Sequence, residues 1–94
     1  MEPPADPVLS KPWAVYLLQC RSGRLYTGVA VDVQARFALH QAGKGARFTK
    51  ADPPVALLAY QWLDGRSAAL KEEYRIKQLP RAQKLDLIRQ WNAT

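Results

Sequence analysis

Two runs of strand-forming residues lie only four positions apart near the start of this chain, and this spacing constrains the fold more than any other feature. Residues 13–20 and 25–29 consist mainly of aromatic, aliphatic and β-branched side chains. The residues between them, Arg21-Ser22-Gly23-Arg24, are suited to a turn. Since two strands joined by so short a connection pair antiparallel, the sequence predicts a β-hairpin.

A helix and a loop are predicted after the hairpin. Asp32 can accept a hydrogen bond from the first turn of a helix over residues 33–41, and Gly43 can end that helix as a C-terminal cap. Residues 43–50 hold two glycines and three cations without a clear periodicity, so we expect a basic loop there.

The rest of the chain predicts one more strand and two more helices. Residues 55–62 form an apolar run that indicates a third strand. A helix capped by Ser67 is expected over residues 67–79, and a last helix over about residues 81–91. The order β-β-α-β-α-α predicts an α+β fold, in which a small three-stranded antiparallel sheet is covered by helices.

Proline content and length indicate the domain organisation. Four of the seven prolines lie within the first twelve residues, where few apolar side chains accompany them. Residues 1–11 are therefore predicted to form a mobile tail. Residues 12–94 are enough for a single domain with one core.

The sequence favours a cytoplasmic location. No apolar run exceeds six residues, which is far short of a membrane span, and the N-terminus lacks the basic start and apolar stretch of a signal peptide. Cys20 is the only cysteine and His40 the only histidine, so neither an internal disulfide nor a zinc site is expected.

The charge of the chain favours an anionic partner. Fourteen Lys and Arg against eight Asp and Glu give a net charge of +6. A positive balance of this size suits nucleic acid or an acidic membrane surface, and charge alone does not choose between them.

Arg36 and His40 are the first candidate functional residues. Their spacing of four places them on one side of the predicted helix, beside Val33 and Phe37, at the seam between core and solvent. There Arg36 could bind a phosphate with its bidentate fork, and His40 could exchange a proton near neutral pH. An ordinary solvated helix face is the alternative.

Two tyrosines of the hairpin could join that pair. Tyr16 and Tyr26 each fit an ordinary packing role, because tyrosine is common in strands. The hairpin can also bring them together under the following helix, so that their hydroxyls converge with Arg36 and His40 on one face of the sheet. Gly28 is consistent with this, since a glycine within a strand marks a bulge or the close approach of a ligand to the backbone.

Glu73 is the candidate metal ligand, and we expect it on the same face of the sheet as the two tyrosines, Arg36 and His40. It falls near the middle of the apolar face of the helix predicted over residues 67–79, whereas Glu72 falls at the margin. A carboxylate there requires a partner, which could be Arg36, Lys77 or a metal ion. A single carboxylate suits Mg²⁺, which keeps most of its waters.

The basic segment is the candidate nucleic-acid contact. Lys44, Arg47 and Lys50 could bind phosphates along a strand, with a base stacked on Phe48. A solubilising loop is the alternative, and the net charge of the chain favours binding.

Taken together, these motifs resemble the GIY-YIG nuclease family. Both tyrosines and the closing glycine of its two triplets match, whereas Ala14 stands in place of the opening glycine. The resemblance covers about residues 13–79 and is closest to small stand-alone bacterial members, which have counterparts of residues 25–28, 40–45 and 69–79. Some members use an Asn beyond the metal-binding Glu, for which this chain offers only Asn92.

The resemblance implies a role for each site residue. Tyr16 would be the general base that takes a proton from water, and Tyr26 would position it. Arg36 would bind the scissile phosphate, His40 would assist proton movement, and Glu73 would hold Mg²⁺ or Mn²⁺ at the leaving oxygen. A nearby cation and the field of the metal are expected to lower the pKa of Tyr16 toward neutral pH.

The function expected from this resemblance is metal-dependent endonuclease cleavage of DNA rather than RNA, selective for structure or for single strands with little base specificity. A protein partner could supply specificity, and no membrane is involved. One alternative is a catalytically weak module of the same fold that binds nucleic acid or docks a partner. Another is a basic structural domain bound to an acidic protein.

Overall fold

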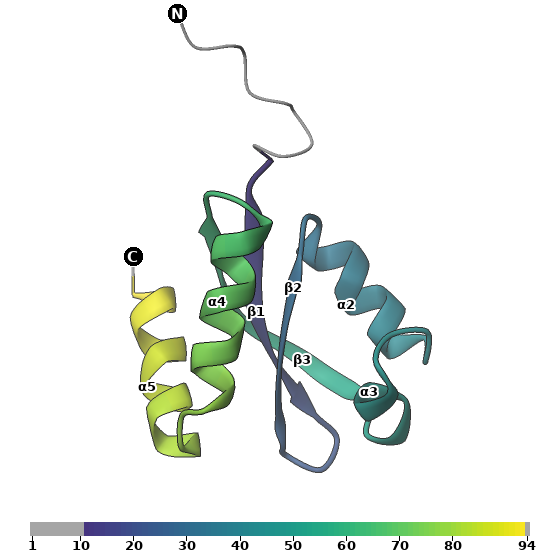
Figure 1. Cartoon of the computed structure of the whole chain (residues 1–94). Coiled ribbons are helices and arrows are strands. Elements are labelled where there is room, and N and C mark those ends of the chain that lie inside the picture. The colour runs from purple at the N-terminus through teal and green to yellow at the C-terminus, as the bar shows by residue number, and fades with distance from the viewer. Residues whose placement is uncertain (1–10, 94) are drawn as a thin grey trace, which may run out of the picture.

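The predicted hairpin forms the centre of the fold. In the computed structural model, which describes residues 11–93, β1 (Trp13–Cys20) and β2 (Leu25–Ala30) pair antiparallel. β3 (Pro54–Leu63) pairs antiparallel with the other edge of β1, which gives the order β2-β1-β3 (Figure 1). The expected three-stranded antiparallel sheet is confirmed. The tail predicted over residues 1–11 lies, except for Lys11, outside the described residues.

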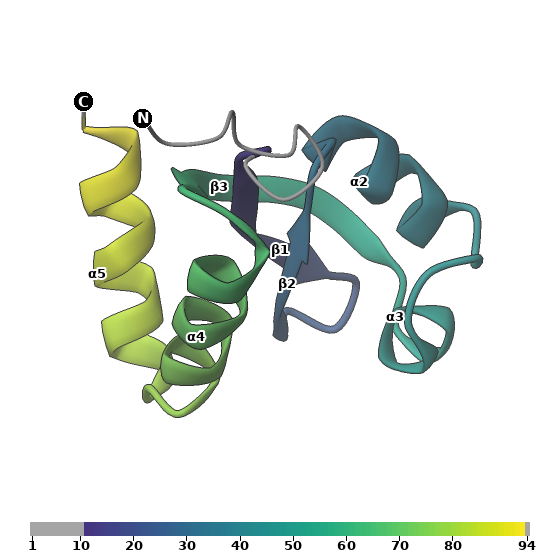
Figure 2. The same ribbon diagram turned by 45° about the horizontal axis from the view of Figure 1, so that its top comes forward.

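Helices cover both faces of the sheet. Figures 1 and 2 show α2 (Val33–Gln41) and α3 (Arg47–Ala51) on one side, and α4 (Arg66–Lys77) and α5 (Arg81–Asn92) on the other. No helix among the described residues is long and apolar enough to cross a membrane.

Alternate residues of β1 build two separate cores. One core, under α2, contains Ala14, Tyr16 and Leu18, and the other, under α4 and α5, contains Val15 and Leu17. This alternation follows from the period of two in a β-strand. Because β1 is the central strand and is covered on both faces, almost its whole length is buried.

Both predicted ends of α2 are confirmed. Asp32 Oδ1 accepts a hydrogen bond from the backbone N–H of Ala35, at 3.0 Å. At the other end Gly43 has φ of +76°, its N–H donates to the carbonyl of His40, and the N–H of Lys44 donates to the carbonyl of Leu39. This pair of bonds is a Schellman motif, in which glycine supplies the left-handed residue.

The loop predicted over residues 43–50 is wrong in its second half, because α3 begins at Arg47. A helix of five residues is too short to show a helical periodicity, so no sequence pattern predicts it. Its turn is held by the N–H of Lys50, which donates to the carbonyl of Ala46, and by the buried side chain of Thr49. Tertiary burial outweighs local propensity here.

The helix predicted over residues 67–79 is α4 in the structure, and it begins one residue earlier and ends two residues earlier than predicted. α4 starts at Arg66 after Gly65, which serves as its N-cap without a side-chain hydrogen bond, so Ser67 is not the cap. The last predicted residues, Gln78 and Leu79, lie beyond the helix, although their N–H groups still bond to the carbonyls of Arg75 and Ile76.

Candidate active site

The candidate residues surround one pocket of about 410 Å³. Tyr16 and Tyr26 come from the hairpin, Arg36 and His40 from α2, and Glu73 from α4. The remaining lining residues are Gly28, Val29, Lys44, Gly45, Ala46 and Leu70. The fold thus brings together five side chains that span 57 positions of sequence.

The convergence takes place around the edge of the sheet, so the expectation of a single shared face is wrong. Tyr16 belongs to the core under α2, whereas α4 packs on the opposite face, where Ile76 contacts the other core. The two faces meet at β2, which is an edge strand and lies between α2 and α4 in both views (Figures 1 and 2). Gly28 and Val29 of this strand line the pocket.

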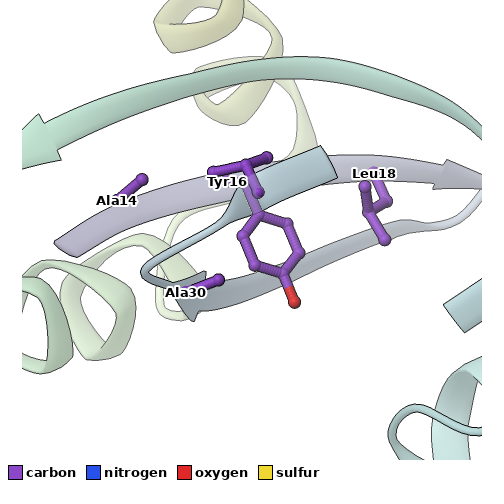
Figure 3. Close-up of a cluster of buried hydrophobic side chains, with 5 residues drawn as sticks. Ala14, Tyr16, Leu18 and Ala30 are labelled. Atoms are coloured by element: carbon purple, nitrogen blue, oxygen red, sulfur yellow. The ribbon is translucent and has the colours of Figure 1, made fainter. Parts of the chain in front are cut away.

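Gly28 allows Tyr16 to reach that edge. The two residues are opposite one another in the β1–β2 ladder, and a Cβ built on Gly28 would overlap the Tyr16 hydroxyl. Figure 3 shows the Tyr16 ring extending away from β1. The ladder continues through Gly28 without a register shift, so the glycine marks a close approach, and the backbone meets a tyrosine of this chain rather than a ligand.

His40 is buried, which corrects its predicted place at the seam between core and solvent. Only 2% of the residue is exposed, because Tyr26 packs against the ring with centroids 5.1 Å apart and α3 covers it. Its Nε2 lies 2.8 Å from Tyr16 Oη, and its Nδ1 lies 2.7 Å from Thr49 Oγ1. Both ring nitrogens therefore have a partner within the protein.

Thr49 and Gly45 are site residues that sequence reasoning missed. Thr49 is fully buried, and its hydroxyl also donates to the carbonyl of Ala46 at 2.9 Å. A Cβ on Gly45 would overlap His40 Nδ1, so glycine leaves the space that the imidazole fills. The only signals in the sequence are that Thr49 lies between the cations Arg47 and Lys50, and that Gly43 and Gly45 follow the predicted helix.

Burial favours the neutral forms of the two tyrosines and the histidine. Desolvation, followed by Tyr26, raises the pKa of Tyr16 well above its usual range, and Arg36 lowers it only in part. Burial also raises the pKa of Tyr26. Burial, followed by Arg36, lowers the pKa of His40. The residues of this chain by themselves thus raise the pKa of Tyr16, although Arg36 acts in the expected direction; the expected effect of a bound metal stays a prediction.

Of the partners that the sequence allows for Glu73, the structure shows Lys77. Its Oε2 lies 3.4 Å from Lys77 Nζ, and 18% of its side chain is exposed. Glu72 instead pairs with Arg75. The Glu73 carboxylate lines the pocket while it holds this ion pair, which is between exposed and half-buried groups and is therefore weak.

The donor set fits a hydrated divalent cation. Among residues 11–93 no group of three or more His, Cys, Asp or Glu side chains could enclose a metal. Glu73 is the one carboxylate in a pocket with room for several waters, since a water occupies about 30 Å³ of liquid volume. One carboxylate with several waters is the coordination that Mg²⁺ accepts.

The cations divide into those at the pocket and those beyond it. Arg36 and Lys44 line the pocket, and neither has a carboxylate within 4 Å among the described residues. Arg47 and Lys50 are exposed on α3 and do not line it. Asn92 is not a site residue, because its Nδ2 donates to the carbonyl of Leu58 at 3.0 Å on the far side of the sheet.

Comparison with known proteins gives a family and a set of relatives. The model of the GIY-YIG catalytic domain matches residues 12–86. A UPF0213 protein of Xanthomonas axonopodis pv. citri is 48% identical over 75 residues, which cover 80% of this chain and 74% of the relative. A UPF0213 protein of Halobacterium salinarum is 50% identical over 70 residues, which cover 74% of this chain and 91% of the relative.

A solved structure supports the same fold. The solution NMR structure of a UPF0213 protein from Bacillus halodurans superimposes with a TM-score of 0.52. It is 36% identical to this chain, and the match covers 82% of each.

Proposed function

The chain belongs to the GIY-YIG catalytic domain family, and we propose that it is a metal-dependent endonuclease that hydrolyses phosphodiester bonds of DNA. The observation that carries the proposal is the hydrogen bond between Tyr16 Oη and His40 Nε2. It places a ring nitrogen of His40 within reach of the proton of a hydroxyl at the pocket. Arg36 and Glu73 supply a cation and a carboxylate to the same pocket.

Tyr16 acts in this proposal as a general base through His40. The attacking water gives a proton to Tyr16 Oη while the Tyr16 hydroxyl proton moves to His40 Nε2. A phenolate therefore does not accumulate, which suits the raised pKa of Tyr16. The water oxygen bonds to phosphorus, the bond to the leaving oxygen breaks, and the leaving oxygen takes a proton from solvent. His40 then returns its proton to solvent through Tyr16.

The residues proposed to bind the phosphate lie on the exposed side of the pocket, which we call the open side. Arg36 offers a bidentate fork to two oxygens of the scissile phosphate, and Tyr26 orients the water beside it. A divalent cation, Mg²⁺ or Mn²⁺, held by Glu73 and water would neutralise charge at the leaving oxygen. Lys44 adds a cation at the rim of the pocket.

The proposed substrate is DNA with unpaired or branched segments. Phe48 is exposed beside Tyr26, with ring centroids 5.8 Å apart, so an unpaired base can stack on it. Stacking tolerates any base, which gives little base specificity. Lys44, Arg47 and Lys50 would bind phosphates, a protein partner would add specificity, and the proposed location is the cytoplasm.

A catalytically weak nucleic-acid-binding module on the same fold is the second candidate. The ion pair between Glu73 and Lys77 favours it, because a cation must displace Lys77 Nζ from the carboxylate. The raised pKa of Tyr16 points the same way, since it slows proton removal unless His40 takes part.

A cleavage assay separates the two candidates. Purified protein is incubated with end-labelled single-stranded, duplex and branched DNA, and with RNA of the same sequence, in Mg²⁺, in Mn²⁺ and in chelator. Endonuclease function predicts cleavage of the unpaired or branched DNA that chelator abolishes. Salt-sensitive binding without cleavage of any substrate would reject the enzyme and support the binding module.

A further inference from the structure

A chain of three hydrogen bonds beside the pocket links Tyr16, His40, Thr49 and Ala46, and the two bonds made by His40 are buried. Tyr16 Oη bonds to His40 Nε2 at 2.8 Å, His40 Nδ1 bonds to Thr49 Oγ1 at 2.7 Å, and Thr49 Oγ1 donates to the carbonyl of Ala46 at 2.9 Å. Tyr16 and His40 are each 2% exposed, and Thr49 is fully buried. Water therefore has little access to the inner bonds.

The last bond of the chain fixes the direction of the others. A carbonyl oxygen can only accept, so the single hydroxyl hydrogen of Thr49 points at Ala46. Thr49 Oγ1 is then an acceptor toward His40, which requires the hydrogen of the neutral imidazole to be on Nδ1. Nε2 keeps its lone pair and faces the Tyr16 hydroxyl as an acceptor.

We propose that Thr49 is a positioning residue that holds His40 in the tautomer with Nδ1 protonated and so leaves Nε2 free to take the Tyr16 proton. The catalytic consequence rests on the proposed endonuclease function, whereas the tautomer does not. With the hydrogen on Nε2, Thr49 would have to turn away from Ala46 to donate to Nδ1. Tyr16 would then face a donor and could not pass a proton to the ring.

The fold around α3 supports this role for Thr49. Ala46 is the N-cap of that short helix, so its carbonyl and the Thr49 side chain are set by the same turn. Gly45, directly before it, lacks the Cβ that would overlap His40 Nδ1. Both features bring the backbone of this turn against the buried edge of the imidazole, which is the edge away from Tyr16.

NMR of the metal-free protein tests the tautomer directly, because His40 is the only histidine of the chain. Long-range ¹H–¹⁵N spectra of histidine-labelled protein near neutral pH distinguish a protonated ring nitrogen from an unprotonated one. The expected result is a protonated Nδ1 and an unprotonated Nε2. A protonated Nε2 in the wild-type protein would overturn the proposal whatever the variants do.

Two variants separate positioning from packing. Thr49→Val keeps the shape and removes the acceptor, and it is expected to give a mixture of tautomers or the reversed one. Thr49→Ser keeps the hydroxyl and is expected to retain the wild-type tautomer. If Thr49→Val does not fold, the wild-type and Thr49→Ser spectra still decide. Wild-type tautomer signals in folded Thr49→Val would overturn the role of Thr49.

Kinetics test the catalytic consequence. Thr49→Val is expected to lower kcat about 10- to 100-fold, by analogy with the loss of the partner that orients a metal-bound histidine, with KM little changed. Thr49→Ser should restore most of the rate. An unchanged kcat in Thr49→Val would overturn the positioning role. Absence of cleavage by the wild-type protein would instead reject the endonuclease, and the NMR result would still stand.

A second, independent inference concerns a basic groove next to the pocket. Arg24, Arg81 and Lys84 surround a hollow of about 240 Å³ together with Leu25 and Phe48. Among the described residues none of the three cations has a carboxylate within 4 Å. Arg81 donates to the carbonyl of Gly23 at 2.8 Å, which holds its guanidinium at the hairpin turn.

The groove adjoins the candidate active site through two aromatic rings. Phe48 lines the groove, Tyr26 lines the pocket, and their ring centroids are 5.8 Å apart. We propose that the groove binds backbone phosphates of the nucleic acid beside the cleaved bond, with a base on Phe48. This proposal rests on the proposed function, because it assigns the same substrate to a neighbouring surface.

Binding in chelator tests the groove without cleavage. A fluorescent single-stranded DNA oligonucleotide is titrated by anisotropy at several NaCl concentrations. The Arg24→Gln/Lys84→Gln variant spares Arg81 and its bond to Gly23, and it should flatten the plot of log K against log salt by about 1.4, or about 0.7 per phosphate contact. The matched control is Arg66→Gln, since Arg66 lies over Trp13 at the opposite end of β1 and should change the slope little.

These results separate the groove proposal from the proposed nucleic-acid function. A slope in the double variant equal to that of Arg66→Gln would overturn the groove, while salt-dependent binding by the wild-type protein would leave the nucleic-acid function standing. Binding by the wild-type protein that does not depend on salt would overturn both.

Discussion

The two sides of the pocket are built in opposite ways. On the closed side Tyr16, His40 and Thr49 are buried, neutral and joined by short hydrogen bonds. On the open side Arg36 is exposed, and Glu73 is partly exposed and held only by an ion pair with Lys77 at 3.4 Å.

The two sides differ in burial, and each suits a different step of the proposed reaction. Proton transfer needs donors and acceptors in fixed positions, which burial and hydrogen bonds provide. Binding of a phosphate or a hydrated cation needs charges that can exchange partners with water, which exposure provides. Substitutions on the closed side should therefore change rate and stability together, whereas those on the open side should change rate or binding and leave stability intact.

The largest expected effect is on the closed side. Tyr16→Phe removes the hydroxyl that passes the proton to His40, and kcat should fall by about 10² to 10⁴, the usual range for a general base. The free energy of unfolding should also fall by about 1–3 kcal/mol, because buried His40 Nε2 loses its partner. Single-turnover cleavage and denaturant unfolding measure the two. A variant with wild-type rates would reject Tyr16 as the base.

Glu73→Gln is the matching test on the open side. The amide keeps the shape of the side chain and loses the charge, so cleavage in Mg²⁺ or Mn²⁺ should fall by about 100-fold or more, since a metal contributes several kcal/mol. The free energy of unfolding should change by less than about 1 kcal/mol, because the pair with Lys77 is partly exposed.

Glu72→Gln is the control for that variant. Glu72 pairs with Arg75 on the same helix and does not line the pocket, so its cleavage rate should stay near that of the wild type. Equal rates in Glu73→Gln and Glu72→Gln across a titration of both metals would place the metal site elsewhere.

Two glycines of one segment separate contact with His40 from backbone strain. Gly45→Ala puts a methyl group against His40 Nδ1 and should cost about 1–3 kcal/mol of stability together with most of the activity. Gly43→Ala has no neighbour within 4 Å but a φ of +76°, so it should cost about 1–2 kcal/mol by backbone strain alone. Activity per folded molecule, measured with unfolding curves, should fall only in Gly45→Ala; a parallel loss in Gly43→Ala would contradict this.

The smallest expected effect is the pH dependence of stability. Burial and Arg36 hold the pKa of His40 below its usual value near 6.5, so the unfolded chain binds a proton that the native protein excludes. The free energy of unfolding should therefore fall as the pH is lowered through about 6.5. His40→Asn should flatten this dependence in thermal unfolding from about pH 7.5 to about pH 5.5. An unchanged dependence in His40→Asn would assign it to other groups.

Local signals in the sequence were enough for much of the fold and part of the site. The hairpin, the cap of α2 by Asp32 and its end at Gly43 all depend on neighbouring residues, and all are confirmed. The helical period placed Arg36 and His40 on the same side of one helix. Each of these predictions needed only the period of an element or the chemistry of its ends.

The burial of the closed side and the part that Thr49 plays in it could not be predicted, because the partners are distant in sequence. The hydroxyl of Thr49 meets a ring nine positions away, and that ring meets Tyr16 another 24 positions away. Sequence alone gives no sign that His40 is buried, since its cover is a helix too short to show a pattern. Gly45 likewise gives no sign in the sequence of the His40 ring that crosses it, whereas Gly28 indicated a close approach without showing that the group is Tyr16.

The edge position of β2 limits how this protein can assemble with others. Tyr16 reaches the pocket by crossing this strand, and the walls of the pocket rise on both of its faces. A partner that docked by adding a strand alongside β2 would fill the route by which substrate arrives. Among the described residues the outer edge of β3, where Asn92 bonds to the carbonyl of Leu58, is the other margin of the sheet, and a strand added there would lie away from that route. Under the proposed endonuclease function, a complex formed by strand addition is therefore expected to use β3, and a peptide designed to extend β2 is expected to block cleavage.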